Sequence, residues 1–263
     1  MNQFHPLVFI KVFPTGTNKP VLCIAADSYG NKKDIVIKLS SGERMDNLAF
    51  LKEFLASRLA KELGLKTPEP IVAIIEQSFI NTQVGKSHFR SLNESLGTNY
   101  ATEYIRGLEQ VSKIDKLNKY QIDDALRIFV FDLIIQNTDR TTVHGKPNLF
   151  TTGIDLWVLD HELAFSFLVP IIGRPMTEPW KIHARDMFMI QNHVIYGKIH
   201  KKKLDFSILD EFLTSIDEGF WSKIEAELPS KWKSPYFEKI KTHINAIKDN
   251  WLEFLNQVKT LLS

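Results

Sequence analysis

Residues 131–140 read Phe-Asp-Leu-Ile-Ile-Gln-Asn-Thr-Asp-Arg, and this stretch joins an apolar helix to a polar turn. The helix is predicted over 120–136, where apolar residues recur at spacings of three and four and cover a broad face. A face this broad indicates a helix that is buried at the centre of a domain. The C-terminal end of the helix therefore points into the run that contains Asp139.

A short hairpin is predicted to follow this turn. Two apolar runs, 149–150 and 156–159, are separated by a Thr-Gly turn signal. Pairing of these runs would bring Asn148, which precedes the first, and Asp160, which follows the second, back toward Asp139. Three polar residues from different parts of the chain are therefore expected to converge.

The first part of the chain has the pattern of a small sheet. Its β-branched and apolar runs are separated by segments rich in Gly, Pro and Asn, which are typical of turns. One amphipathic helix, with Leu at spacings of three or four, interrupts the sheet. We expect an antiparallel meander in the order βββαβ, with strands at 6–13, 21–26, 34–39 and 71–75 and the helix at 46–63.

The rest of the chain is expected to be mainly helical. The clearest late helix has Ser234 as its N-cap and Pro235 as its first residue, and its apolar stripe runs nearly to the C-terminal end. Such a stripe is typical of core packing rather than of a cofactor site. The sequence therefore predicts an α+β chain, with the sheet first and the helices after it.

Composition limits the classes of function. The chain has 263 residues, 44% of them hydrophobic, which is enough for an ample core. With a net charge of +2, the chain lacks the large excess of basic residues that is typical of nucleic-acid-binding proteins. The single cysteine, Cys23, excludes an internal disulfide framework and fits a buried thiol in a reducing cytoplasm. No apolar run reaches the roughly 20 residues that span a bilayer, and no leader pattern is present, so a cytoplasmic protein is expected.

The converging polar residues suit phosphoryl transfer. That reaction needs a cation at the phosphates, oxygen ligands for magnesium and a carboxylate beside the acceptor hydroxyl. Asn148 and Asp160 offer the hard oxygen ligands that magnesium prefers, and Asp139 is left to act as the base. The alternative for any one aspartate is an ordinary cap or turn, so the hypothesis depends on the combination and its order.

A second pair of charged residues precedes this group. Lys38 lies in an otherwise apolar strand, on the same face as Val36. A charge in such a strand is costly unless an opposite charge pairs with it. Glu53, on the following helix, could pair with it and hold the ammonium toward phosphates. The alternative is an ordinary strand-edge lysine with a solvated glutamate.

A glycine-containing loop precedes the second predicted strand. Its residues Gly16, Thr17, Asn18 and Lys19 could cover phosphates with main-chain N–H groups, because glycine permits a close approach. As a motif this loop is weak. The sequence contains no G-x-x-x-x-G-K-[ST] run and no G-x-G-x-x-G run, which argues against a Walker-type or dinucleotide site.

Taken together, these segments resemble the HipA-like kinase family, in its short stand-alone branch. The resemblance spans nearly the whole chain, and its strongest parts are the stretch 131–140, Pro147-Asn148-Leu149 and Leu159-Asp160-His161-Glu162-Leu163-Ala164-Phe165. It implies a two-lobed, protein-kinase-like fold with the nucleotide between the lobes. The expected lobes are an antiparallel sheet with a helix over 1–106 and a mainly helical part over 107–263.

The resemblance also implies a role for each matching residue. It gives phosphate binding to Lys38 and its partner Glu53, adenine recognition by the main chain to Glu103, Tyr104 and Ile105, catalysis to Asp139, and magnesium binding to Asn148 and Asp160. The loop after Asp139 is longer than is usual in the family. His144 is therefore an alternative metal ligand.

The resulting hypothesis is a serine/threonine protein kinase that uses ATP and Mg²⁺. Two alternatives stay open: a pseudokinase or nucleotide-binding regulator, and a lipid or small-molecule kinase. The resemblance further implies a toxin-like regulator that modifies a protein substrate and is neutralised by an antitoxin-like partner. The sequence itself names no substrate, and it predicts neither direct nucleic-acid binding nor a membrane.

Overall fold

The computed structural model describes residues 3–14, 18–143, 147–169 and 177–263. The chain divides into two compact units, each of which is described by itself. Unit 1 comprises Met1–Ser57, Pro68–Arg106 and Ile224–Ser234, and unit 2 comprises Arg58–Thr67, Gly107–Lys223 and Pro235–Ser263. Each unit gathers separate segments, whereas the lobes predicted over 1–106 and 107–263 are contiguous. That these two lobes are the functional parts of the chain stays a prediction.

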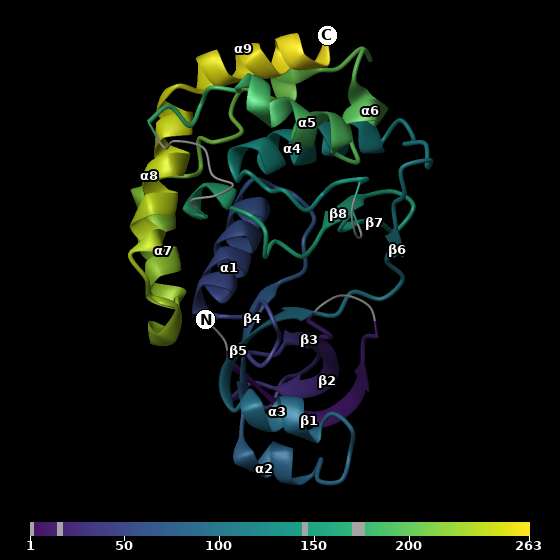
Figure 1. The fold of residues 1–263 in the computed structure, drawn as a ribbon, viewed down its shortest axis with the longest axis vertical. Helices are drawn as coiled ribbons and strands as arrows, with labels where there is room; N and C mark the ends of the chain where they lie inside the picture. Colours follow the sequence, from purple (N-terminus) through teal and green to yellow (C-terminus); the bar gives the residue numbers. More distant parts are fainter. Residues whose placement is uncertain (1–2, 15–17, 144–146, 170–176) are drawn as a thin grey trace. The chain divides into compact units, whose positions relative to one another are not determined.

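Unit 1 is built on a five-stranded closed barrel (Figure 1). Neighbouring strands follow the order β1-β2-β3-β5-β4. All pairings are antiparallel except the one that closes the barrel, where Gln3 and Phe4 of β1 run parallel to Val72 and Ala73 of β4. The strands are β1 (Gln3–Val12), β2 (Val21–Ala26), β3 (Lys32–Lys38), β4 (Pro70–Ile75) and β5 (Gly97–Glu103).

This barrel corrects the predicted antiparallel meander. The register of β1 against β2 shifts twice, between Pro6 and Val8 and between Phe9 and Lys11. Bulges of this kind bend a strand and increase its twist, so the sheet can curl until its first strand meets its last. Closure also removes the open strand edge where β1 meets β4.

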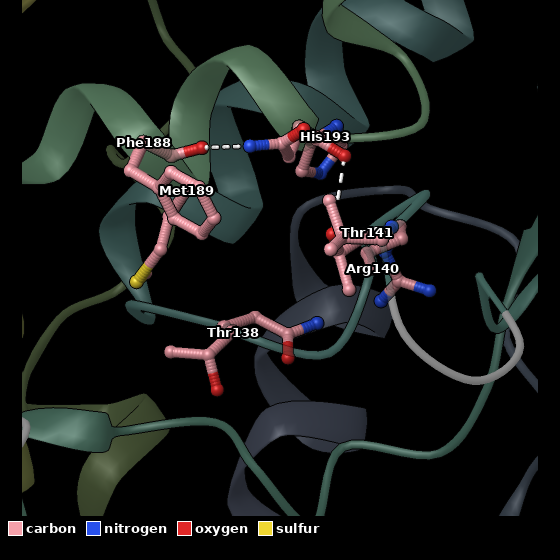
Figure 2. A pocket seen from close by; sticks show the side chains of 9 residues that line it. Thr138, Arg140, Thr141, Phe188, Met189 and His193 are labelled. Carbon is pink, nitrogen blue, oxygen red and sulfur yellow. Dashed lines mark hydrogen bonds between the residues drawn. The ribbon is translucent and has the colours of Figure 1, made fainter.

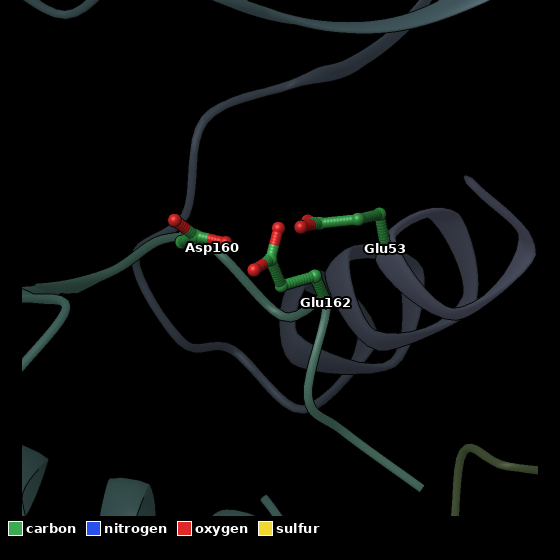
Figure 3. Close-up of side chains that lie close together, drawn as sticks. All are labelled: Glu53, Asp160 and Glu162. Atoms are coloured by element: carbon green, nitrogen blue, oxygen red, sulfur yellow. The ribbon is translucent and has the colours of Figure 1, made fainter. Parts of the chain in front are cut away.

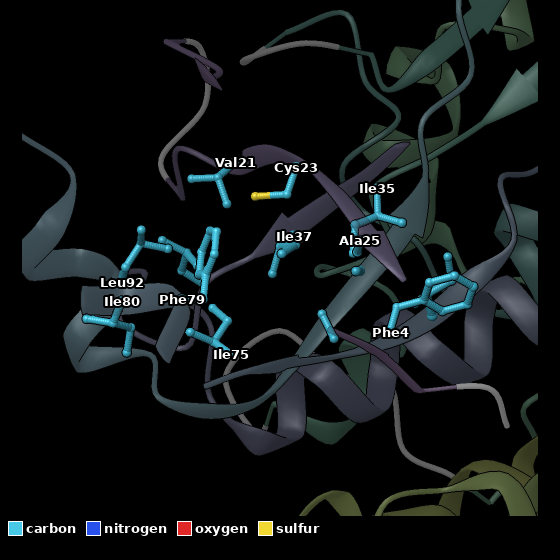
Figure 4. Close-up of a cluster of buried hydrophobic side chains, with 14 residues drawn as sticks. Phe4, Val21, Cys23, Ala25, Ile35, Ile37, Ile75, Phe79, Ile80 and Leu92 are labelled. Atoms are coloured by element: carbon cyan, nitrogen blue, oxygen red, sulfur yellow. The ribbon is translucent and has the colours of Figure 1, made fainter. Parts of the chain in front are cut away.

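Alternation of side chains places the apolar core inside the barrel (Figure 4). On β3, Ile35 and Ile37 are fully buried in this core, whereas Val36 and Lys38 lie on the other face. Phe79, Ile80 and Leu92, from helices α2 (Gln77–Asn81) and α3 (Phe89–Glu94), complete the cluster. Lys38 is thus excluded from the apolar core by the period of its own strand.

Cys23 lies inside this core and is completely buried. Burial raises the pKa of its thiol to about 12. We therefore expect Cys23 in the native protein to resist Ellman's reagent at pH 8 and to react fully once guanidinium unfolds the chain, because the thiolate is the reactive form. Rapid reaction of the native protein would contradict this burial.

A late segment of the chain completes unit 1. Trp232, in the short 3₁₀ helix Ser230–Trp232, is fully buried and packs against Phe50, Phe54 and Tyr100. Phe50 and Phe54 belong to α1 (Asn47–Glu62), whose residues up to Ser57 lie in unit 1. This packing explains why 224–234 cluster with residues that are far away in sequence.

Unit 2 is mainly helical and carries one small sheet (Figure 1). Its first long helix, α4 (Gln121–Ile134), is buried along most of its length. The sheet has the order β6-β7-β8, and β7 and β8 form the predicted hairpin. The other elements are β6 (Glu109–Gln110), β7 (Leu149–Thr151), β8 (Leu156–Val158), α5 (Met187–Asn192), α6 (Tyr196–Ile199), α8 (Tyr236–Asp249) and α9 (Trp251–Leu262), with 3₁₀ turns at Ser166–Leu168, Ala184–Asp186 and Phe206–Leu209. The helix α7 (Glu218–Glu227) belongs to unit 2 up to Lys223 and to unit 1 from Ile224.

The single C-terminal helix predicted from the sequence is wrong, because the structure has two. The break is at Asn250, whose backbone (φ −113°, ψ 29°) leaves the helical region. Its side-chain amide donates to the carbonyl of Ala246 at 2.9 Å, which satisfies a carbonyl at the end of α8. The turn also lets the indole of Trp251 donate to the carbonyl of Leu209. The apolar stripe continues across this break, so the sequence pattern alone does not reveal it.

Among the described residues, no helix has both the length and the apolar character that crossing a membrane requires.

Candidate active site

The polar turn after α4 is held against the end of its own helix. The helix ends because Gln136 adopts a left-handed conformation (φ 47°), which is a common way to stop a helix. The Asn137 side chain then donates to Asp132 Oδ1 at 2.9 Å and accepts from the main-chain N–H of Asp139 at 3.2 Å. The position of Asp139 is therefore fixed from inside the unit.

Below this turn lies a buried cluster of charges. Arg140 Nε donates to Asp132 Oδ2 at 2.6 Å, and His193 Nε2 lies 2.9 Å from the same oxygen. The Arg140 and Asp132 side chains are 0% and 1% exposed. Burial alone would raise the pKa of Asp132, but Arg140 and His193 outweigh it and hold that pKa well below its usual range. Asp132 is therefore a carboxylate at neutral pH and acts as the shared acceptor of the cluster.

The same arginine connects the turn to the hairpin. Arg140 Nη1 donates to the carbonyl of Asn148, which also accepts from the N–H of Leu159 at 3.4 Å. The side-chain amide of Asn148 donates to Asp139 Oδ2 at 2.5 Å. The structure thus brings Asn148 against Asp139, as the hairpin pattern predicts, and the loop, hairpin and buried helix form one hydrogen-bonded assembly.

Two acidic residues follow the hairpin in unit 2. Carboxylate oxygens of Asp160 and Glu162 lie within 4.8 Å of each other, and both side chains extend from the segment after β8 (Figure 3). Asn148 and Asp160 both have left-handed backbones (φ 47° and 62°), which Asn and Asp tolerate better than most residues. Magnesium binds oxygen ligands, and the side chains of these loop residues offer carboxylate and amide oxygens. The residues present therefore fit a magnesium site, in which Glu162 is a member that the sequence pattern did not single out.

Within unit 1, the structure joins Lys38 and Glu53. Lys38 lies at the end of β3 on the face away from the core, and its ammonium forms an ion pair with a carboxylate oxygen of Glu53 on α1. The two side chains are 13% and 1% exposed. Such a desolvated pair holds the ammonium in one place, because losing either partner would leave a buried charge.

The segment that resembles a hinge begins at Glu103, the last residue of β5, and two of its N–H groups are hydrogen-bonded within unit 1. The N–H of Glu103 donates to the carbonyl of Glu69 at 3.0 Å, and the N–H of Tyr104 donates to the carbonyl of Asp34 at 2.9 Å. In the part of the chain that the structure describes, the N–H of Ile105 has no main-chain acceptor. Of the three predicted amides, those of Glu103 and Tyr104 therefore already bond to main-chain carbonyls of unit 1.

The predicted phosphate loop is only partly described. Gly16 and Thr17 lie outside the described residues, as does the alternative metal ligand His144. Asn18 Oδ1 accepts from the N–H of Arg44 at 3.3 Å, and Lys19 has a positive φ of 40°. The roles of this loop stay predictions.

The chain is similar to known proteins in its sequence and its fold. A family model described as HipA-like kinase matches residues 8–260. The chain is similar to the proinflammatory kinase CtkA of Helicobacter pylori, with 12% identity, a TM-score of 0.50, and coverage of 96% of this chain and 95% of that chain. It also matches the Rio2 kinase-ADP/Mg²⁺-phosphoaspartate complex from Chaetomium thermophilum, with 11% identity, a TM-score of 0.35, and coverage of 97% and 71%. None of the curated proteins matches it.

The likeness to CtkA shows that the chain has a kinase-like fold of mixed helices and strands. The family model covers almost the whole sequence, including each residue from Gly16 to Asp160 that carries the resemblance. The chain therefore belongs to the HipA-like kinase family.

Proposed function

We propose that this chain is an ATP- and Mg²⁺-dependent protein kinase that transfers the γ-phosphoryl group to a serine or threonine hydroxyl. Membership of the HipA-like kinase family supports phosphotransfer. The observation that carries the finer proposal is the hydrogen bond from Asn148 to Asp139, in a loop that Arg140 anchors to the buried helix. A carboxylate next to an amide that can offer an oxygen to magnesium is what the reaction requires, and this supports the proposal.

Asp139 acts as the base in this proposal. Its carboxylate orients the acceptor hydroxyl and takes its proton while the hydroxyl oxygen bonds to the γ-phosphorus and the bond from that phosphorus to the ADP oxygen breaks. The Asn148 amide donates to one carboxylate oxygen of Asp139 and so fixes the orientation of this carboxylate. The loop thus holds the base in a fixed orientation.

The other residues bind the nucleotide and the metal. Lys38, fixed by Glu53, offers its positive charge to the phosphates, and the main chain at Ile105 offers an N–H to adenine. Asn148 and Asp160, with Glu162 beside Asp160, would hold the magnesium. When bound, this ion supplies charge that neutralises the phosphate oxygens. A toxin-like role and an antitoxin-like partner stay predictions from the resemblance.

We expect wild-type protein with Mg-ATP to gain the mass of a phosphoryl group or to transfer it to a mixed library of Ser and Thr peptides. Asp160→Asn should lower that transfer about 10²-fold or more, because a neutral amide is a poor substitute for a carboxylate that holds magnesium. Intact-mass spectrometry, with titration of Mg-ATP binding, provides the measurement. Asp155→Asn, on the same hairpin, is the matched control and should behave like wild type.

The two alternatives give different outcomes in this experiment. Binding of Mg-ATP without transfer to the protein or to any peptide would establish a pseudokinase. Transfer only to lipid or small-molecule hydroxyls would replace the protein-kinase proposal. If neither nucleotide binding nor transfer is observed, the proposed function is wrong.

A further inference from the structure

A small cavity lies beside the catalytic loop, entirely within unit 2 (Figure 2). Its volume is about 110 Å³. One wall is formed by the loop, through residues that directly flank Asp139, namely Thr138 and Arg140, and continues through Thr141. The opposite wall is formed by Phe188 and Met189 of α5. The cavity is therefore next to the base that the proposed function assigns, but it is not part of the nucleotide or metal site.

The two walls are fixed to each other by main-chain bonds. The carbonyl of Asn192, at the end of α5, accepts from the N–H of Thr142 at 2.8 Å and from Thr141 Oγ1 at 3.2 Å. The N–H of Val194 donates to the carbonyl of Arg140 at 3.0 Å. Thr141 and His193 form an antiparallel bridge. The backbone of the two walls is consequently preformed, because these bonds join the loop to the end of α5.

Most of the polar side chains that line the cavity already form hydrogen bonds. Asn137 bonds to Asp132 and Asp139, Arg140 bonds to Asp132 and Asn148, and His193 contacts Asp132. The amide of Asn192 donates back to the carbonyl of Phe188 at 2.7 Å. These groups cannot bind a polar ligand without losing existing bonds. Apart from the Thr138 hydroxyl in the loop wall, the chemistry left for a ligand is therefore apolar contact.

The rim of the cavity is apolar and exposed. Phe188 is 68% exposed and Val143 is 41% exposed, and Met189 is half-buried between them. Burying such side chains against an apolar group is favourable because it removes their surface from water. An engineered cavity of about 150 Å³ binds benzene, so about 110 Å³ suits roughly four carbon atoms, the size of a valine or leucine side chain.

We propose that this cavity is a specificity pocket for the protein substrate, which binds one aliphatic side chain close in sequence to the phosphorylated serine or threonine. The inference rests on the proposed function, since it takes Asp139 as the base. Thr138 and Arg140 line the cavity on either side of Asp139 in the sequence. An extended peptide advances about 3.3 Å per residue, so a side chain within about three positions of a hydroxyl at Asp139 is within reach of this cavity. The pocket thus names the substrate class as a Ser/Thr segment with a valine, leucine, isoleucine or methionine within about three positions of the acceptor.

The test uses full-length protein, Mg-ATP and a Ser/Thr peptide library in which each position from −3 to +3 (roughly three residues on either side) is varied in turn. Wild type should prefer aliphatic residues over Gly, Ser and Asp at one position, with kcat/KM about 10- to 100-fold higher. Phe188→Ala should reduce that preference about tenfold, mainly by raising KM. Leu252→Ala on α9 is the matched control, because Leu252 is similarly exposed at 77% and lies elsewhere on unit 2.

Each outcome decides the proposal. An aliphatic preference that Phe188→Ala weakens and Leu252→Ala retains would establish the pocket. Phosphorylation without any aliphatic preference, or a preference that Phe188→Ala leaves intact, would overturn the pocket while the proposed function stands. Binding of Mg-ATP with phosphorylation of no peptide would also overturn it. Failure to bind Mg-ATP would instead show that the proposed function itself is wrong.

Discussion

Asp139→Asn is expected to lower the rate of phosphoryl transfer by about 10²- to 10⁴-fold, the usual contribution of a positioned general base. An asparagine is almost isosteric, and its carbonyl oxygen can still accept the hydrogen bond that Asn148 now donates to Asp139. The loop should therefore keep its shape and lose only the proton acceptor. Single-turnover transfer to a peptide, measured together with the dissociation constant for Mg-ATP, separates these effects.

The matched control for this substitution is Asp123→Asn. Asp123 is an exposed acid in the first turn of α4, whose other end leads to the catalytic loop. Its loss removes only a favourable interaction with the helix dipole, about 0.3–1 kcal/mol of stability. We expect its transfer rate to match wild type. A fall in Mg-ATP affinity of Asp139→Asn as large as the fall in rate would show that Asp139 binds substrate rather than removes a proton.

Much of this site can be predicted from local sequence patterns. The apolar face over 120–136 specifies a buried helix, and the Thr-Gly turn specifies the hairpin, so the meeting of Asn148 with Asp139 follows from two short-range signals. The side on which Lys38 lies follows from the two-residue period of its strand. Its pairing with Glu53 follows from the need of a charge in an apolar strand for a partner.

Other features depend on contacts that no local pattern encodes. The strand β5 begins with Gly97 and contains Asn99, residue types that are depleted in strands. Asn99 is nevertheless buried, because its side chain bonds to the main chain of Ser40, Ser95 and Gly97. Barrel closure depends in the same way on two register shifts in β1, which become visible only when the partner strand is known.

The buried charges of unit 2 are the clearest example of such a long-range feature. Asp132 interrupts an apolar helix, and this is the local signal that it needs a partner. Its partners come from the turn that follows, as Arg140, and from beyond α5, as His193. A histidine without metal-ligand spacing suggests surface or packing roles, yet His193 is buried against a carboxylate. The sequence alone indicates that Asp132 needs partners, but it does not identify which residues these are.

Asp132→Asn is expected to lower the free energy of unfolding of unit 2 by about 3–5 kcal/mol, the cost of breaking a buried ion pair on one side. The substitution leaves the Arg140 guanidinium buried without its counter-charge. Because Arg140 also binds the carbonyl of Asn148, the hairpin should loosen and phosphoryl transfer should fall as well. Guanidinium denaturation, followed by circular dichroism and by tryptophan fluorescence, measures the loss and tests whether the transition stays cooperative.

A pH series separates this charge effect from simple loss of packing. The pKa of Asp132 is lowered in the folded protein, so the ionised group contributes its stability above its unfolded pKa of about 3.9 and loses it as pH falls below that value. The difference between wild type and Asp132→Asn should therefore shrink by about 1.4 kcal/mol per unit below pH 4. Glu218→Gln, which breaks the exposed pair with Lys241, is the control and should cost at most about 1 kcal/mol. A difference for Asp132→Asn that persists unchanged at pH 3 would mean that the carboxylate is retained for its shape and hydrogen bonds, and that its charge does not hold Arg140 and the catalytic loop in place.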